Sequence, residues 1–192
     1  MKTRMWILLF LSTLNTIGQS LEKLKSNTKK IYDANYTMDF EAVTELTYPS
    51  IVAQIGKDQF IAQLDANYQN DEFRMRLEIV NPTFSYSNIK KIESHSFCVI
   101  SYKNPVRYFF ENKLDGLSAP RRVALLKQTT LDTDVIFEPK RNSINVKQNS
   151  RLIAVYDDTT KFQWTFFNFD DLTQRQLFYT TFNNNVKKEL GL

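Results

Sequence analysis

The sequence predicts an α+β fold in which helices come first and pack on a curved antiparallel sheet. Two changes in hydrophobic period support this. Apolar residues recur at three- and four-residue steps over residues 21–68, a helical spacing, and at every second residue after Asp71, as in strands. Residues 118–128 return to a helical pattern and predict an extra helical insertion between strands. Helices followed by strands, rather than alternating with them, are typical of α+β domains.

The helical region divides at residues that cap or break helices. A first amphipathic helix starts at residue 21, with its repeated positions at Leu21, Leu24, Thr28, Ile31, Tyr32 and Tyr36. Asp39 predicts the N-cap of a second helix, because its carboxylate can accept from an unpaired N–H of the next turn. Pro49 ends that helix by forcing Tyr48 out of helical geometry. Gly56 predicts the cap that ends a third helix, before a fourth.

Strand patterns account for most of the chain after residue 71. The sequence predicts strands over residues 73–79, 96–102, 106–111, 135–138, 144–146 and 151–156. The last of these is apolar on both faces, so we expect it in the middle of the sheet. Phe162, Trp164 and Phe166 alternate and predict a final strand. Thr173 and Gln176 have the spacing of a capping box and predict the start of the last helix.

The first residues predict a signal peptide that covers residues 1–18. Lys2 and Arg4 form a positive start, an apolar run over residues 5–11 follows, and Gly18 is a small residue suited to cleavage. The apolar run is shorter than the about 20 residues of a membrane-spanning helix. We therefore expect a secreted or periplasmic protein with a single domain, residues 19–192, and no membrane span after cleavage.

Charge and cysteine content exclude several kinds of protein. Loss of Lys2 and Arg4 with the signal peptide lowers the formal net charge from +4 to +2, which gives no electrostatic basis for binding nucleic acid. Cys98 is the only cysteine, so the chain forms no internal disulfide. Its apolar neighbours predict a buried structural thiol, and an intermolecular disulfide is the alternative. Stability must then come from the burial of apolar and aromatic side chains.

Three motifs carry a resemblance to a known family: Met38-Asp-Phe-Glu41 followed by Leu46-Thr-Tyr-Pro49, then Ile55-Gly-Lys-Asp58, and the late Phe162-Gln-Trp-Thr-Phe166. With them the chain resembles the nuclear transport factor 2-like (ketosteroid-isomerase-like) superfamily over most of residues 24–178, and in particular its small secreted bacterial members of unknown function. The resemblance implies helices packed into the mouth of a cone-shaped sheet. Residues 113–133 and 139–150 are longer than the compact family pattern requires.

Few side chains are suited to catalysis. Ketosteroid-isomerase-like enzymes use an Asp base with Tyr donors in an apolar pocket. Asp39 and Glu111 are the candidates for such a base, although Asp39 is better explained as a helix cap. His95 is the third candidate and the only histidine, which excludes a multi-histidine metal site. In a strand it points away from Cys98, which excludes a dyad of the two. We expect no catalytic residue, no cofactor and no metal.

Aromatic residues are the remaining candidates for a site. We expect a pocket between helices and sheet, lined by Tyr36, Tyr48, Phe97, Tyr102, Phe110 and Trp164. Such rings either fill the core or surround a small apolar ligand that tyrosine hydroxyls orient. A homodimer through the sheet face, as relatives in the family form, is a further alternative. The expected function is a non-catalytic binding or protein-interaction domain. The alternative is a cofactor-independent isomerase, dehydratase or cyclase with Asp39 or Glu111 as base.

Overall fold

The computed structural model describes residues 21–129 and 134–192, and the predicted signal peptide, residues 1–18, lies outside them. A helix covers residues 21–37, and three shorter helices follow: α2 (Phe40–Leu46), α3 (Pro49–Ile55) and α4 (Lys57–Tyr68). The boundaries have the predicted causes. Asp39 Oδ1 accepts from Ala42 N at 3.1 Å, Pro49 is the first residue of α3, and Gly56 separates α3 from α4 with a φ of 92°.

Antiparallel strands follow the helices, as predicted, and form two sheets. Within the described residues, the larger sheet has five strands: β2 (Phe84–Tyr86), β3 (Lys90–Ile92), β4 (His95–Lys103), β8 (Asn149–Tyr156) and β9 (Thr165–Asn168). The smaller sheet has four, in the order β1 (Phe73–Leu77), β5 (Val106–Phe110), β7 (Ser143–Lys147) and β6 (Asp134–Glu138). A 3₁₀ turn, η1 (Pro139–Arg141), joins β6 to β7. The apolar strand β8 lies between β4 and β9, inside its sheet as expected.

The two sheets meet where two neighbouring strands continue from one sheet into the other. β4 leads into β5 through Asn104 and Pro105, and β7 leads into β8 through Gln148. Pro105 has no N–H to donate, which interrupts the ladder of hydrogen bonds. Asn104 N donates to Gln148 O at 2.9 Å across the interruption. We call Asn104, Pro105 and Gln148 the sheet junction.

Helices cover both faces of the larger sheet. The helix of residues 21–37 packs on the face that carries Cys98, Ile100 and Leu152. The opposite face packs against α3 and against two helices that follow the strands: α6 (Leu172–Thr181) and α7 (Asn184–Leu190). Cys98 is fully buried, as predicted for a structural thiol. None of the helices in the described chain has the length and apolar composition that crossing a bilayer requires.

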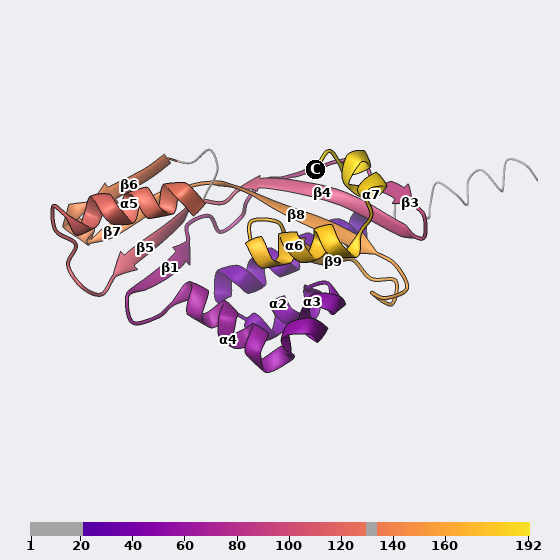
Figure 1. The fold of residues 1–192 in the computed structure, drawn as a ribbon, viewed down its shortest axis with the longest axis horizontal. Helices are drawn as coiled ribbons and strands as arrows, with labels where there is room; N and C mark the ends of the chain where they lie inside the picture. The colour runs from indigo at the N-terminus through magenta and orange to yellow at the C-terminus, as the bar shows by residue number, and fades with distance from the viewer. Residues whose placement is uncertain (1–20, 130–133) are drawn as a thin grey trace, which may run out of the picture.

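The predicted insertion is helix α5 (Ser118–Thr129), which covers the smaller sheet. Its Val123 and Leu126 pack against a cluster that includes Val106 and Ile144. Figure 1 shows α5 along β6 and β7 at one end of the molecule, apart from the other helices. α5 thus extends the smaller sheet's core without reaching the larger sheet.

Several predictions for the C-terminal third and for the short strands are wrong. β9 starts at Thr165, and Phe162 lies before it in a turn with a φ of 57° and is 62% exposed. Asp171, not Thr173, caps α6, because Asp171 Oδ1 accepts from Gln174 N at 2.8 Å. α7 follows α6 and has no predicted counterpart, so α6 is not the last helix. β2 and β3 were not predicted, since strands of three residues carry too little alternation.

Candidate functional site

A cavity of about 170 Å³ lies over the sheet junction, between helices and strands. One wall comes from the helix of residues 21–37, α2 and α4, and the other from β1, β4, β5 and β8. The segment between β9 and the first turn of α6 completes the lining. A cavity of about 150 Å³ is enough to hold benzene, so this one has room for about one small ring.

The lining combines apolar side chains with tyrosines. The apolar residues are Ile31, Val43, Leu64, Met75, Leu77, Val106, Leu152 and Phe166. The tyrosines are Tyr32, Tyr68, Tyr102 and Tyr108. The rings of Tyr32 and Tyr102 meet edge to face, with centres 5.6 Å apart. The lining is therefore apolar with hydroxyl groups distributed over it, a composition suited to small organic ligands.

Tyr32 and Tyr68 are anchored by hydrogen bonds within the protein. Tyr32 Oη donates to Ile79 O at 2.5 Å, and Tyr68 Oη donates to Asn35 Oδ1 at 3.1 Å. Burial, followed by the effect of its neighbours Tyr36 and Asp33, raises the pKa of Tyr32 to about 12. Burial likewise raises the pKa of Tyr68 above its usual value. Both side chains are thus neutral at physiological pH and keep the wall in place.

Tyr102 and Tyr108 are half-buried and more accessible to a ligand. Burial raises the pKa of each above its usual value, and the negative charge of Asp170 is the next cause at Tyr102. Tyr108 packs edge to face on Phe73 at 5.1 Å, and its hydroxyl makes no hydrogen bond within the described residues. These two hydroxyls are the lining groups best placed to contact a bound molecule.

Asp170 is the acidic group that faces this cavity. Its side chain is exposed, yet enough protein surrounds it for burial to raise its pKa. Hydrogen bonds from Ser150 and Arg151 and the charges of Arg151 and Arg175 offset part of this rise. Asp170 forms no ion pair within residues 21–129 and 134–192, although Arg151 and Arg175 are near enough for their charges to act on its pKa.

Strand pairing explains the position of Asp170. β9 stops pairing with β8 at Asn168, and β6 pairs with β7, so on the edge away from β4 no strand of the described residues lies beside residues 149–151 of β8. Asp170 lies at this edge, where its Oδ1 accepts from Arg151 N at 3.3 Å. Arg151 N, which β9 does not pair, thus has a carboxylate as its acceptor at the sheet junction.

Neighbouring polar side chains hold the segment that carries Asp170. Gln174 Oε1 accepts from Asn168 N at 2.8 Å, and Asn168 Oδ1 accepts from Asp170 N at 3.1 Å. Asp171 also lines the cavity, but its carboxylate caps α6. Asp171 is therefore committed to the helix, and Asp170 is the carboxylate left for a ligand.

Of the six aromatic residues predicted to line a pocket, Tyr102 lines this cavity. Tyr48 and Phe97 are buried in the core beside α3, α6 and α7, and Trp164 is buried beneath the helix of residues 21–37. Phe110 packs in the cluster of the smaller sheet. Tyr36 is half-buried on its helix and is not part of the lining. Most of the predicted rings therefore fill the core.

The three catalytic candidates lie outside the cavity lining. Asp39 is an exposed helix cap. His95 Nε2 is 3.6 Å from the buried Asp157 Oδ2, and the His95 ring packs on Phe97 with centres 5.8 Å apart. His95 and Cys98 lie on opposite faces of β4, as predicted.

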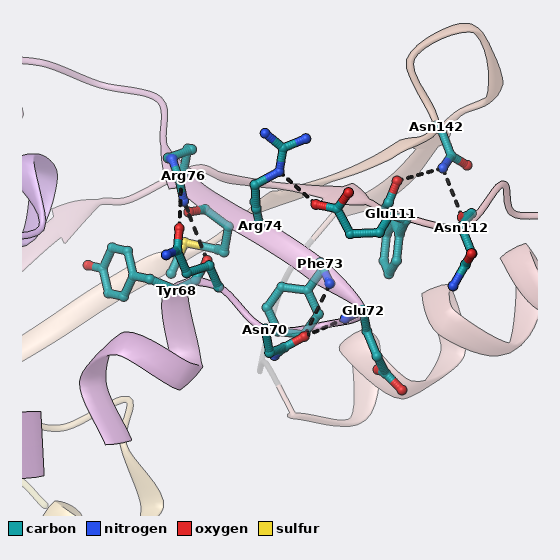
Figure 2. A network of polar contacts seen from close by, with 12 residues as sticks. Tyr68, Asn70, Glu72, Phe73, Arg74, Arg76, Glu111, Asn112 and Asn142 are labelled. Atoms are coloured by element: carbon teal, nitrogen blue, oxygen red, sulfur yellow. Dashed lines mark hydrogen bonds and ion pairs between the residues drawn. The ribbon is translucent and has the colours of Figure 1, made fainter. Parts of the chain in front are cut away.

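Glu111, the remaining candidate, belongs to an exposed polar network at the edge of β1 and β5. Figure 2 shows Arg74 Nε donating to Glu111 Oε1, at 2.8 Å. In the same network, Arg76 donates to the backbone oxygen of Tyr68 at 3.4 Å, which links β1 to the end of α4. Glu111 thus supports the strand edge and does not enter the cavity.

Asp170, Tyr32 and Tyr68 were not predicted as site residues, and Tyr32 was predicted only on the apolar face of its helix. Asp170 and Asp171 are adjacent in the sequence, although a helix needs only one aspartate at its N-cap. That surplus acid between a strand and a helix was the signal available.

Among the described residues, no three or more His, Cys, Asp or Glu side chains are grouped to hold a metal ion. No family model matches the chain, and no curated protein or solved structure matches it. Function must therefore be inferred from the cavity itself. Its chemistry is that of a small, partly apolar compartment with tyrosine hydroxyls and one carboxylate.

Proposed function

We propose that this protein is a secreted or periplasmic, non-catalytic binding domain that holds one small molecule over the sheet junction. The observation that carries the proposal is the cavity of about 170 Å³ with its four tyrosines. An apolar part of the ligand would contact Leu64, Met75 and Leu77, and a polar part would meet Tyr102 and Asp170. Such a division between apolar walls and a few polar groups is typical of ligand sites. The location rests on the predicted signal peptide.

We also propose that the domain is nuclear transport factor 2-like. Helices that precede an antiparallel sheet, with a cavity between the two, support this assignment. A cone-like arrangement of the two sheets about the junction is part of the proposal. α5 lies outside the cavity lining, so it does not block the site.

A screen of single-ring fragments of all three charge types by ligand-observed NMR tests the binding function. We expect at least one class to bind the wild-type protein and to lose binding in Met75→Phe, which fills the cavity from β1. Val80→Phe is the matched control, because Val80 is 57% exposed on the same segment and outside the lining. No bound fragment, or binding that Met75→Phe leaves intact, would refute the proposal.

Asp170 beside Tyr102 favours a second candidate, the cofactor-independent isomerase, dehydratase or cyclase. A carboxyl with a pKa raised by burial can take and return a proton, and a neutral tyrosine can stabilise the oxyanion that forms. In this function Asp170 replaces the bases expected from the sequence, Asp39 and Glu111. The test is deuterium exchange at the α-carbon of a small cyclic ketone in heavy water. Catalysis predicts that Asp170→Asn slows exchange by about 10²- to 10⁴-fold; no exchange above buffer removes this candidate.

We propose that the protein partner is a second copy of this chain, bound through the sheet face. Ile136 on β6 is 49% exposed, on the face opposite the buried Val135. Light scattering after size exclusion tests it: Ile136→Asp is expected to convert a dimer to a monomer. A wild-type protein that is monomeric at high concentration would contradict the dimer.

A further inference from the structure

We propose that the ligand of this cavity is a small primary ammonium compound, a protonated amine carried on a single ring or a short apolar chain. The inference rests on the proposed binding function and adds the charge and hydrogen-bonding character of the ligand. Three properties of the lining support it: its charge, the direction of its hydrogen bonds and its aromatic surface.

The charge of the lining is negative. Its ionisable side chains other than tyrosine are Asp170 and Asp171, and no Lys, Arg or His is among the lining residues. Asp171 Oδ1 is used by α6, at 2.8 Å from Gln174 N. The guanidinium of Arg151 lies over the ring of Phe169 at 5.6 Å, and Arg151 is not part of the lining. Arg151 and Arg175 act on Asp170 through their charges from outside the lining, and a cation inside the cavity would be its first ion-pair partner among the described residues.

The lining offers acceptors to a ligand that donates. The hydroxyl hydrogens of Tyr32 and Tyr68 are used in bonds to Ile79 O and Asn35 Oδ1, and the hydroxyl of Tyr108, which has no partner within the described residues, can accept as well as donate. An ionised Asp170 offers only acceptors. A primary ammonium brings three donors, and charged hydrogen bonds of this kind are among the stronger ones.

The aromatic and apolar surface favours an amine with a small organic body. The faces of tyrosine rings attract cations, and Tyr102 and Tyr108 are the accessible rings of the lining. Leu64, Met75 and Leu77 provide apolar contact for a ring or chain. The volume of about 170 Å³ excludes compounds with two rings and large polyamines.

Three compounds with the same ring and different charge test the inference: benzylamine, benzyl alcohol and benzoate. Their binding to the mature wild-type protein is measured by calorimetry at neutral pH and low salt. We expect benzylamine to bind at least about tenfold more tightly than benzyl alcohol, and benzoate to bind most weakly. This comparison needs no variant, so it does not depend on how well a variant folds.

Asp170→Asn then tests the residue. It preserves shape and removes charge, so we expect benzylamine affinity to fall at least about tenfold and benzyl alcohol affinity to change less than about threefold. Asp158→Asn is the matched control, because Asp158 is an exposed aspartate outside the lining. Thermal melting confirms that both variants are folded.

Each alternative result overturns the inference. Equal or tighter binding of benzyl alcohol or benzoate, or an Asp170→Asn variant that still prefers the amine, would show that charge does not select the ligand. The binding function would then stand. If none of the three compounds binds, the ammonium inference fails, and the fragment screen with Met75→Phe decides separately whether the cavity binds anything.

Discussion

An aspartate and a tyrosine lie at each end of strand β8, but the two aspartates make different contacts. At the C-terminal end, Asp157 is buried, accepts from Thr160 N at 2.8 Å and from Tyr48 Oη at 3.1 Å, and lies near His95. At the N-terminal end, Asp170 accepts from one backbone N–H at 3.3 Å and faces a cavity. The first carboxylate holds the fold together, whereas the second is left for a ligand.

The largest expected difference between the two ends is in stability. Asp157→Ala leaves the Thr160 N–H and the Tyr48 hydroxyl buried without an acceptor, so we expect it to lower the free energy of unfolding by about 3 kcal/mol. Asp170→Ala removes a carboxylate whose charged form is disfavoured by burial, so we expect the free energy of unfolding to change by less than about 1 kcal/mol. Urea denaturation at neutral pH measures both. Equal losses would mean that both sites are structural and would break the comparison.

The tyrosines give the next largest difference. Tyr48→Phe removes a buried hydroxyl that donates to Asp157, and we expect it to cost about 1 kcal/mol of folding free energy. Tyr102→Phe is expected to change stability by less than about 0.5 kcal/mol. The hydroxyl of Tyr102 should matter instead for ligand affinity, which calorimetry with benzylamine measures. A Tyr102→Phe variant that is as unstable as Tyr48→Phe would make Tyr102 part of the core.

Local chemistry explains which parts of the fold the sequence could predict. Asp39, Pro49 and Gly56 act on residues within one turn of themselves, and the helix boundaries follow directly from them. The position of β8 inside its sheet likewise follows from its continuous apolar run, because a strand with one face in water needs apolar residues only at alternate positions. Such signals do not depend on which distant segment the chain meets.

The site depends on distant partners, which is why most of it was missed. Tyr32 is fixed by a bond to Ile79, and Asp170 by a bond to Arg151, neither of which is a sequence neighbour. Strands β7 and β8 follow each other as one continuous strand. The cavity lies where β9 stops pairing with β8 and β6 pairs with β7 on the same edge, and the pairing register determines both positions. Tyr102 lines the cavity because strand β4 leads into the junction. Periodicity alone cannot supply such pairings.

The pH dependence of stability is a smaller effect that distinguishes Asp170. Its pKa is raised above the usual 3.8, so as pH rises through the range above 3.8 the unfolded chain loses this proton before the folded protein does. The contribution of Asp170 to stability therefore falls over that range. We expect the free energy of unfolding of Asp170→Asn, relative to wild type, to increase from acidic to neutral pH. Urea denaturation at a series of pH values measures it, and a constant difference would contradict the shift.

Asp115, at the start of α5, is expected to have the smallest effect on the pH dependence of stability. Its pKa is lowered, whereas that of Asp170 is raised. Hydrogen bonds from the backbone and side chain of Ser118, and then from the backbone of Leu117, lower the pKa of Asp115 to about 2. Its contribution to stability is therefore present above the unfolded pKa of 3.8 and is lost as pH falls through about 2. We expect Asp115→Asn to be less stable than wild type at neutral pH, with a difference that shrinks on acidification.

The two acid–base profiles should thus run in opposite directions with pH, because hydrogen bonds have the larger effect on the pKa of Asp115 and burial has the larger effect on that of Asp170. Carbon-detected NMR titration of the two carboxyl groups provides an independent check, with Asp115 titrating below 3.8 and Asp170 above it. Addition of benzylamine should lower the pKa of Asp170 and leave that of Asp115 unchanged, since a bound cation favours the ionised form of the carboxyl beside it. A pKa of Asp170 that does not respond to the amine would separate this carboxylate from the ligand and return it to the structural class of Asp157.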